Sequence, residues 1–363
     1  MKRWLSKIRV FFELRTVRIL ISLLVLASCC FGIVEVFYLR NGTYGYSKDL
    51  QSNRHVAQRN GCYMTDKDYL DALAADGEAA KDEKFLIRAH KLASTNGLFG
   101  HNNSGAVKKF LDELSQATPE IEGRFTITER ECDQYANDMP VVVQKIVDYS
   151  NDLNMRTQFE EKKQALATAA HISGTLDCRY SYIGFMARVL SSSATVFELS
   201  AIQRADVTPS SMKALLDACL PFVQKPIRTA QILKKEQLRL LNNIAIAKGE
   251  RKIDPTSINY VSNDDFPISS RMLHKLPGVE DALSSRVYEA FRIGLATDAD
   301  LKEAGSKNND SSPFGIFSDR IKNNKASTDY LFHYAPEITK GKNLGLLLQM
   351  ESDIRLLTKP MVQ

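Results

Sequence analysis

The feature that most constrains this chain is an apolar run, Ile19–Leu39, in which Glu35 is the single charged side chain. As a helix, a segment of this length spans about 31 Å, close to the hydrocarbon thickness of a bilayer. The apolar core of a cleaved secretory signal is shorter, about 7–15 residues, and polar residues follow it. Here the apolar run continues well past Cys29, so the sequence predicts a transmembrane helix that is not removed.

Basic residues precede the predicted membrane helix. Six lysines and arginines lie within residues 1–18, and few follow the helix closely. By the positive-inside rule, the N-terminus stays in the cytoplasm and everything after residue 40 is extracytoplasmic. We expect a single-pass protein of the bacterial inner membrane facing the periplasm, in preference to a eukaryotic secretory membrane.

The net charge of +5 lies entirely within residues 1–40, because the remaining chain has equal numbers of acidic and basic side chains. Nucleic-acid binding normally requires a basic face on the folded domain. The charge distribution therefore favours the lipid bilayer and a protein as partners, and no nucleic acid.

Three residues of the predicted membrane helix share one face. Ser28, Gly32 and Glu35 are spaced i, i+4 and i+7, and small residues four positions apart let two membrane helices approach closely. An acid within a membrane is costly and often functional, although Glu35 is near enough to the outer end to reach water. This face predicts a partner helix. Alternatively, the sequence ending at Cys29 is a lipoprotein cleavage box, and Cys29 is the acylated first residue of the mature chain.

The part beyond the membrane helix shows helical periodicity nearly throughout. Thr208 followed by Pro209 is typical of a helix start, whereas the run Ser191–Ser193 is expected to interrupt a long apolar segment. Successive amphipathic helices with short loops pack as a bundle or an irregular solenoid. The sequence thus predicts an all-α protein, with a single transmembrane helix followed by an extracytoplasmic helical bundle or irregular solenoid. Its expected divisions are a basic leader (1–18), the membrane helix (19–39), a stalk (40–61), a small helical subdomain (62–120), a main helical domain (121–305), and a C-terminal aromatic segment with a last helix (306–363).

Four cysteines beyond the membrane helix are candidates for disulfide bonds in an oxidising compartment: Cys62, Cys132, Cys178 and Cys219. They allow three pairings, and we expect at least one bond. Cys219 also fits a small buried apolar residue, because it lies on the apolar side of a predicted helix. No cysteine or histidine spacing resembles a metal-binding set, so we expect neither a metal nor another cofactor.

One short motif has a catalytic form. Ser210 and Lys213 make a Ser-x-x-Lys sequence at a helix start, the spacing with which penicillin-binding enzymes and serine β-lactamases activate a serine. The Lys-Thr-Gly element of those enzymes is missing, and polar residues of a first helical turn explain the match more simply. The sequence favours a scaffold or subunit of a membrane complex that acts by protein binding. The alternative is an anchored envelope hydrolase or transferase that uses Ser210 and Lys213.

Overall fold

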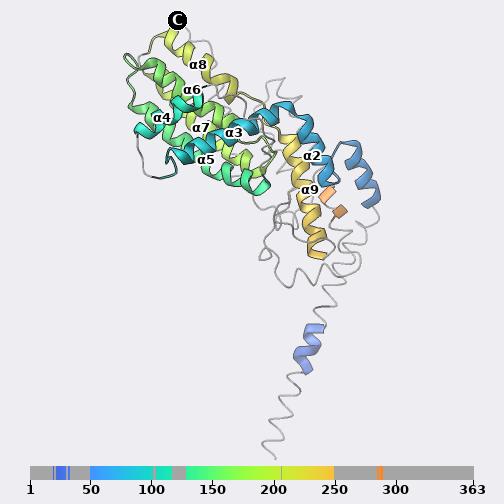
Figure 1. Ribbon diagram of the computed structural model, residues 1–363. Coiled ribbons are helices and arrows are strands. Elements are labelled where there is room, and N and C mark those ends of the chain that lie inside the picture. Colours follow the sequence, from blue (N-terminus) through green and yellow to red (C-terminus); the bar gives the residue numbers. More distant parts are fainter. Residues whose placement is uncertain are drawn as a thin grey trace, which may run out of the picture.

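The structure is a computed structural model that describes residues 19, 22–29, 32, 50–100, 104–116, 128–205, 207–248, 284–285 and 287–288. Every regular element within this part of the chain is a helix, which confirms the all-α prediction (Figure 1). Residues 50–59 are also helical. The labelled helices are α2 (Asp66–Ala75), α3 (Gly77–Thr95), α4 (Ser104–Ser115), α5 (Glu129–Asp152), α6 (Phe159–Thr175), α7 (Tyr182–Arg204), α8 (Pro209–Val223) and α9 (Thr229–Lys248).

Helices α5 to α8 form the main bundle. Helix α5 packs against α6 and α7, and α6 also packs against α7 and α8. Helix α3 contacts α5 and α6 and joins this bundle to α2, which lies beside α9 at the other end of the folded part (Figure 1). A hydrogen bond of 2.9 Å from Asn242 of α9 to Asp66 of α2 ties these two helices together.

Helix α6 lies at the centre because it contributes to both large hydrophobic clusters. Ala165, Ala169 and Ile172 belong to the cluster formed with α3, α4 and α5. Leu166 and Ala170 belong to the cluster formed with α2, α7, α8 and α9. All five side chains are fully buried, and the alanines allow neighbouring helices to approach closely. The two clusters are therefore built on two different faces of one helix.

Side-chain caps explain where several helices begin. Thr65 and Thr128 each form a capping box at the starts of α2 and α5. Asp76 ends α2 and accepts hydrogen bonds from the first amides of α3, so the two helices follow one another without a linker. Ser181 caps α7. Thr208 caps α8 with Pro209 in the first turn, as the sequence predicts.

The predicted interruption at Ser191–Ser193 is wrong, because α7 runs unbroken from Tyr182 to Arg204. Hydroxyl side chains can disturb a helix by competing for backbone groups. Here Ser193 Oγ and Thr195 Oγ1 donate to carbonyl oxygens one turn back, at 2.8 and 3.3 Å, and this pattern is compatible with a continuous helix.

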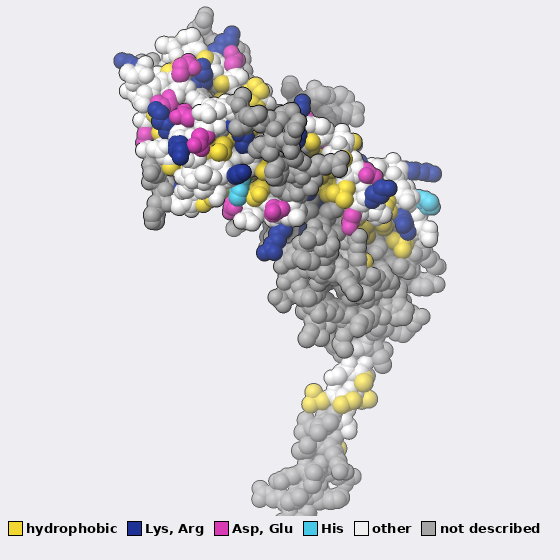
Figure 2. Space-filling view, viewed as in Figure 1, with side chains coloured by type: hydrophobic (Ala, Val, Ile, Leu, Met, Phe, Trp, Pro, Cys, Tyr) yellow, Lys and Arg dark blue, Asp and Glu magenta, His cyan; other side chains and the backbone are white. Residues whose placement is uncertain are grey.

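The predicted membrane helix is described only at residues 19, 22–29 and 32, all of them helical. In that segment Leu23, Leu24, Val25 and Leu26 are each more than half exposed, and Figure 2 shows its apolar side chains on the surface. Within the described residues, none of the helices combines the length and apolar character that crossing a membrane requires. Most of the predicted span, with Glu35, lies outside the described residues, as do the leader and the segment 306–363.

Candidate functional site

Among the described residues, the outer face of α7 is the most unusual surface. Ile183, Leu190 and Phe197 are spaced seven residues apart and are 37%, 47% and 69% exposed. At 3.6 residues per turn, this spacing places the three large apolar side chains along one line. The partly exposed positions between them, Met186, Ser193 and Ala194, are uncharged, and Ala201 beyond Phe197 is small and exposed.

Apart from Arg204 in its last turn, the charged residues of α7 are buried and lie off this face. Within Tyr182–Gln203, which the structure describes in full, the charged residues are Arg188 and Glu198, only 2% and 7% exposed. Surface helices normally bury apolar residues and expose charged ones. Between Tyr182 and Gln203, α7 presents large apolar side chains to solvent and buries its two charged side chains, so its outer face is uncharged up to the last turn.

The buried charges of α7 are paired. Arg188 Nη1 lies 2.7 Å from Asp177 Oδ2, and its other amino group bonds the Lys225 carbonyl oxygen. Glu198 lies 3.2 Å from Lys162 Nζ of α6. Paired buried charges are tolerated where lone ones are not, because each partner offsets the other's loss of hydration. Both buried charges of α7 thus have partners within this chain.

The Arg188–Asp177 pair belongs to a larger ion network between α3, the α6–α7 loop and the α8–α9 loop. Arg228 donates to Asp82 at 3.2 Å and to Asp177 at 3.5 Å. Lys225 forms ion pairs with Asp82 and with Glu78. All except Glu78 have strongly buried side chains. The network joins segments that are far apart in the sequence, so we assign it a structural role: it holds α3 and the two loops in fixed relative positions.

Two histidines are stacked on aromatic rings, and one of them, His171, lies beside this network. His171 lies between Phe85 and Phe222, with ring centroids 3.7 and 4.2 Å away. Burial, assisted by the positive charge of Lys225, lowers the pKa of His171 to about 4, so it is neutral near pH 7. His90 stacks on Tyr135 and lies 3.0 Å from Asp138 Oδ2.

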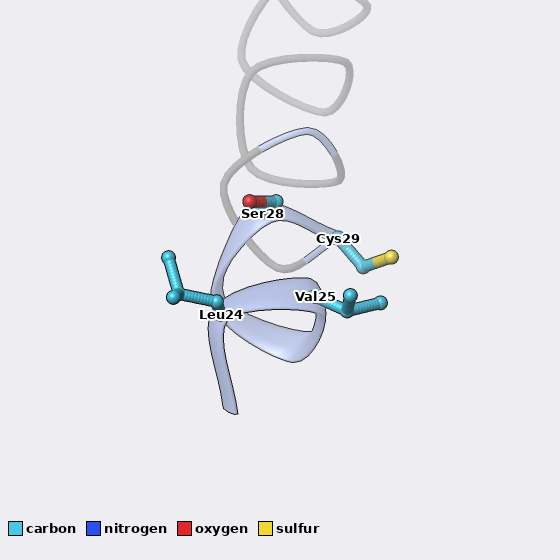
Figure 3. A pocket seen from close by; sticks show the side chains of 4 residues that line it. All are labelled: Leu24, Val25, Ser28 and Cys29. Carbon is cyan, nitrogen blue, oxygen red and sulfur yellow. The ribbon is translucent and has the colours of Figure 1, made fainter. Parts of the chain in front are cut away.

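The described part of the predicted partner face lies apart from the bundle. Ser28 is exposed, and a Cβ atom added at Gly32 would meet nothing within 4 Å. A shallow hollow at this segment is lined by four residues of one helix, with Leu24 and Ser28 on one side and Val25 and Cys29 on the other (Figure 3). An open surface of this kind is not an enclosed ligand site.

The four cysteines predicted to form disulfide bonds are buried in the structure. Cys62, Cys132, Cys178 and Cys219 are buried free thiols, so no disulfide is present among the described residues. Burial raises the pKa of Cys219 to about 12, which fits the expected small buried apolar residue.

Ser210 and Lys213 are both exposed at the start of α8. The Ser210 hydroxyl lies 3.2 Å from Thr208 Oγ1, the side chain that caps the helix. This contact is the one expected of a polar first-turn residue.

Sequence reasoning did not single out the outer face of α7. The available signal was the seven-residue spacing of Ile183, Leu190 and Phe197, together with Arg188 and Glu198 inside an otherwise uncharged segment. That segment was interpreted only as apolar and interrupted.

Within the described residues, no group of three or more His, Cys, Asp or Glu side chains is placed to hold a metal ion. Comparison of the chain with family models, with curated proteins and with solved structures finds no match. The candidate site is therefore assigned from geometry alone: it is the uncharged outer face of α7.

Proposed function

We propose that this chain is a membrane-anchored, extracytoplasmic helical protein that acts by binding another membrane protein. The observation that carries the proposal is the exposed row Ile183, Leu190 and Phe197 on α7. A contiguous apolar surface on an otherwise polar protein typically marks an interaction site. Charged side chains of both signs are interspersed over the visible face of the bundle, so a solvated surface is available elsewhere (Figure 2).

The geometry favours a groove on another protein as the occupant. A row of large side chains on one helix is complementary to a hydrophobic groove, into which each side chain can insert. Because the α7 face carries no exposed charge between Tyr182 and Gln203, the matching groove is apolar and uncharged. Phe197, the most exposed of the three, is the expected anchor, since aromatic residues dominate binding energy at such interfaces.

The size of this face supports anchoring of both proteins in one membrane. A helix face about 35 Å long and 10 Å wide offers on the order of 350 Å², whereas a stable interface between free proteins buries about 800 Å² per partner. Confinement to one bilayer raises the effective concentration of the partner and compensates for a small contact. The predicted membrane helix, with Ser28, Gly32 and Glu35 facing a partner helix, supplies such an anchor and a second contact.

Site-directed photo-crosslinking in intact membranes tests the proposal. A photoreactive side chain at Leu190 is expected to link to residues that line a groove on a second membrane protein. The same probe at Val141 of α5 is the matched control, because Val141 is 49% exposed on a neighbouring helix. Phe197→Glu is expected to abolish the product from position 190 while leaving helix content unchanged by circular dichroism.

Other results would reject this assignment. A crosslink from position 190 to a second copy of the chain would indicate self-association, and a crosslink to lipid would indicate a membrane-facing surface. An equal product from positions 141 and 190 would show that the α7 face has no special role. A protease-protected C-terminal domain in spheroplasts would reject the extracytoplasmic location.

A further inference from the structure

Two of the four buried cysteines lie against each other. Cys132 is in the first turn of α5 and Cys178 is in the loop between α6 and α7, and both are fully buried. Cys132 lies close enough to Cys178 to raise the pKa of the Cys178 thiol through a side-chain hydrogen bond. A second contact joins the same two segments, because Ser181 Oγ donates to Asp133 Oδ1 at 2.6 Å. The proximity of the thiols is therefore part of how α5 packs on the α6–α7 loop.

The other cysteines lie elsewhere in the core. Cys219 is on α8 within the cluster that contains Tyr69 and Leu215, and Cys62 packs with Ala57 near α9. Cys178 belongs to the cluster of α3 to α6. Of the pairings that the sequence leaves open, the structure thus supports one that joins neighbouring side chains.

The loop that carries Cys178 is held firmly. Tyr180 has a φ of 55°, in the left-handed region that non-glycine residues rarely adopt, and its hydroxyl donates to Asp76 at 2.7 Å. The neighbouring Arg179 pairs with Glu83 at 2.8 Å. These contacts hold the backbone that directly follows Cys178.

We propose that Cys132 and Cys178 form a structural disulfide bond when the chain folds on the oxidising side of the membrane. This inference rests on the proposed extracytoplasmic location. The two thiols lose two protons and two electrons as the S–S bond forms. The electrons reduce the disulfide of a thiol–disulfide oxidoreductase, or of oxidised glutathione, to two thiols through a mixed disulfide. The thiols of the structure are the reduced state of this pair.

Oxidation takes place before the core closes. The hydrogen bond to Cys132, together with burial, raises the pKa of Cys178 well above its ordinary value, so the folded protein holds few reactive thiolates. An oxidoreductase also cannot reach two fully buried sulfur atoms. The bond therefore forms while α5 and the α6–α7 loop are still accessible, and the finished fold protects it.

The test is mass spectrometry of the full chain extracted from membranes, with free thiols alkylated before any reduction. A linked pair of peptides containing Cys132 and Cys178 is expected, with Cys62 and Cys219 alkylated. Cys132→Ser is expected to leave Cys178 alkylated, while Cys219→Ser is the control that leaves the linked pair intact. A parallel sample is unfolded, reduced and refolded in a mixture of reduced and oxidised glutathione.

The two samples separate the possible failures. Linked peptides in the membrane sample support the inference and the location. Linked peptides only after refolding in glutathione show that the pair can form but that the chain does not reside in an oxidising compartment, which rejects the proposed location and the bond in the cell. Free thiols in both samples, or a different pairing, reject this inference alone.

Discussion

Replacing Asp177 with asparagine removes one charge from the ion network and leaves the shape of the side chain nearly unchanged. Asp177 is fully buried, and its carboxylate accepts hydrogen bonds from Arg188 at 2.7 Å and from Arg228 at 3.5 Å. Arg228 keeps an ion pair with Asp82 at 3.2 Å, whereas Asp177 is the carboxylate that faces Arg188. The substitution therefore leaves the charge of Arg188 buried without an acidic partner.

The expected cost follows from that unpaired charge. Breaking a buried ion pair costs about 3–5 kcal/mol, and the amide oxygen of asparagine retains one acceptor, so we expect about 3 kcal/mol. For a folded unit of this size, such a loss lowers the melting temperature by roughly 6–12 °C. The double variant with Arg188→Met is expected to recover part of the loss, because it removes the uncompensated charge as well.

Urea unfolding followed by circular dichroism measures the effect. Asp217→Asn on the exposed side of α8 is the matched control and is expected to change the free energy of unfolding by less than about 0.5 kcal/mol. If Asp177→Asn costs no more than this control, the network does not stabilise the fold. The reasoning about Arg188 is also refuted if the double variant is less stable than Asp177→Asn alone.

Two other positions have sharp expected outcomes. A Cβ atom at Gly184 would lie 2.2 Å from the Leu176 carbonyl oxygen, so Gly184→Ala is expected to lower the free energy of unfolding by about 3 kcal/mol. A Cβ atom at Gly77 would meet nothing within 4 Å, so Gly77→Ala is expected to raise it by up to about 1 kcal/mol. Equal urea midpoints for the two variants would contradict this contrast. The pKa of His171 is about 4 when folded and near its ordinary value when unfolded, so its contribution is complete above about pH 6.5 and is lost as the pH falls towards 4. Between pH 7 and 4.5, the free energy of unfolding of His171→Phe is expected to fall by about 1–2 kcal/mol less than that of the parent, after allowance for partial exposure. The exposed control His55→Phe is expected to keep the parent's pH profile. Matching profiles for all three proteins would contradict the assignment.

The sequence was sufficient for the fold class and for local helix signals. The predicted start of α8 at Thr208 and Pro209 agrees with the structure, because helix capping is a local property. The interruption predicted at Ser191–Ser193 was wrong, since tertiary burial of α7 outweighs the weak helix propensity of serine.

The candidate site was beyond local reasoning. Whether Leu190 or Arg188 faces solvent depends on which neighbouring helix covers each side of α7, and this is decided by packing between distant segments. The same holds for Cys132 and Cys178, whose contact depends on how α5 meets the loop after α6. Such relations are long-range, so spacing along the chain does not reveal them.

The position of α6 between the two hydrophobic clusters has a consequence for how the protein comes apart. If either cluster lost its packing, one face of α6 would become exposed, and the other cluster depends on the same helix. The folded region should therefore melt as one cooperative unit and not as two halves. Backbone amides at Ala169 and Ala170 should exchange with deuterium only when the whole unit opens, which places them among the most slowly exchanging positions of the molecule.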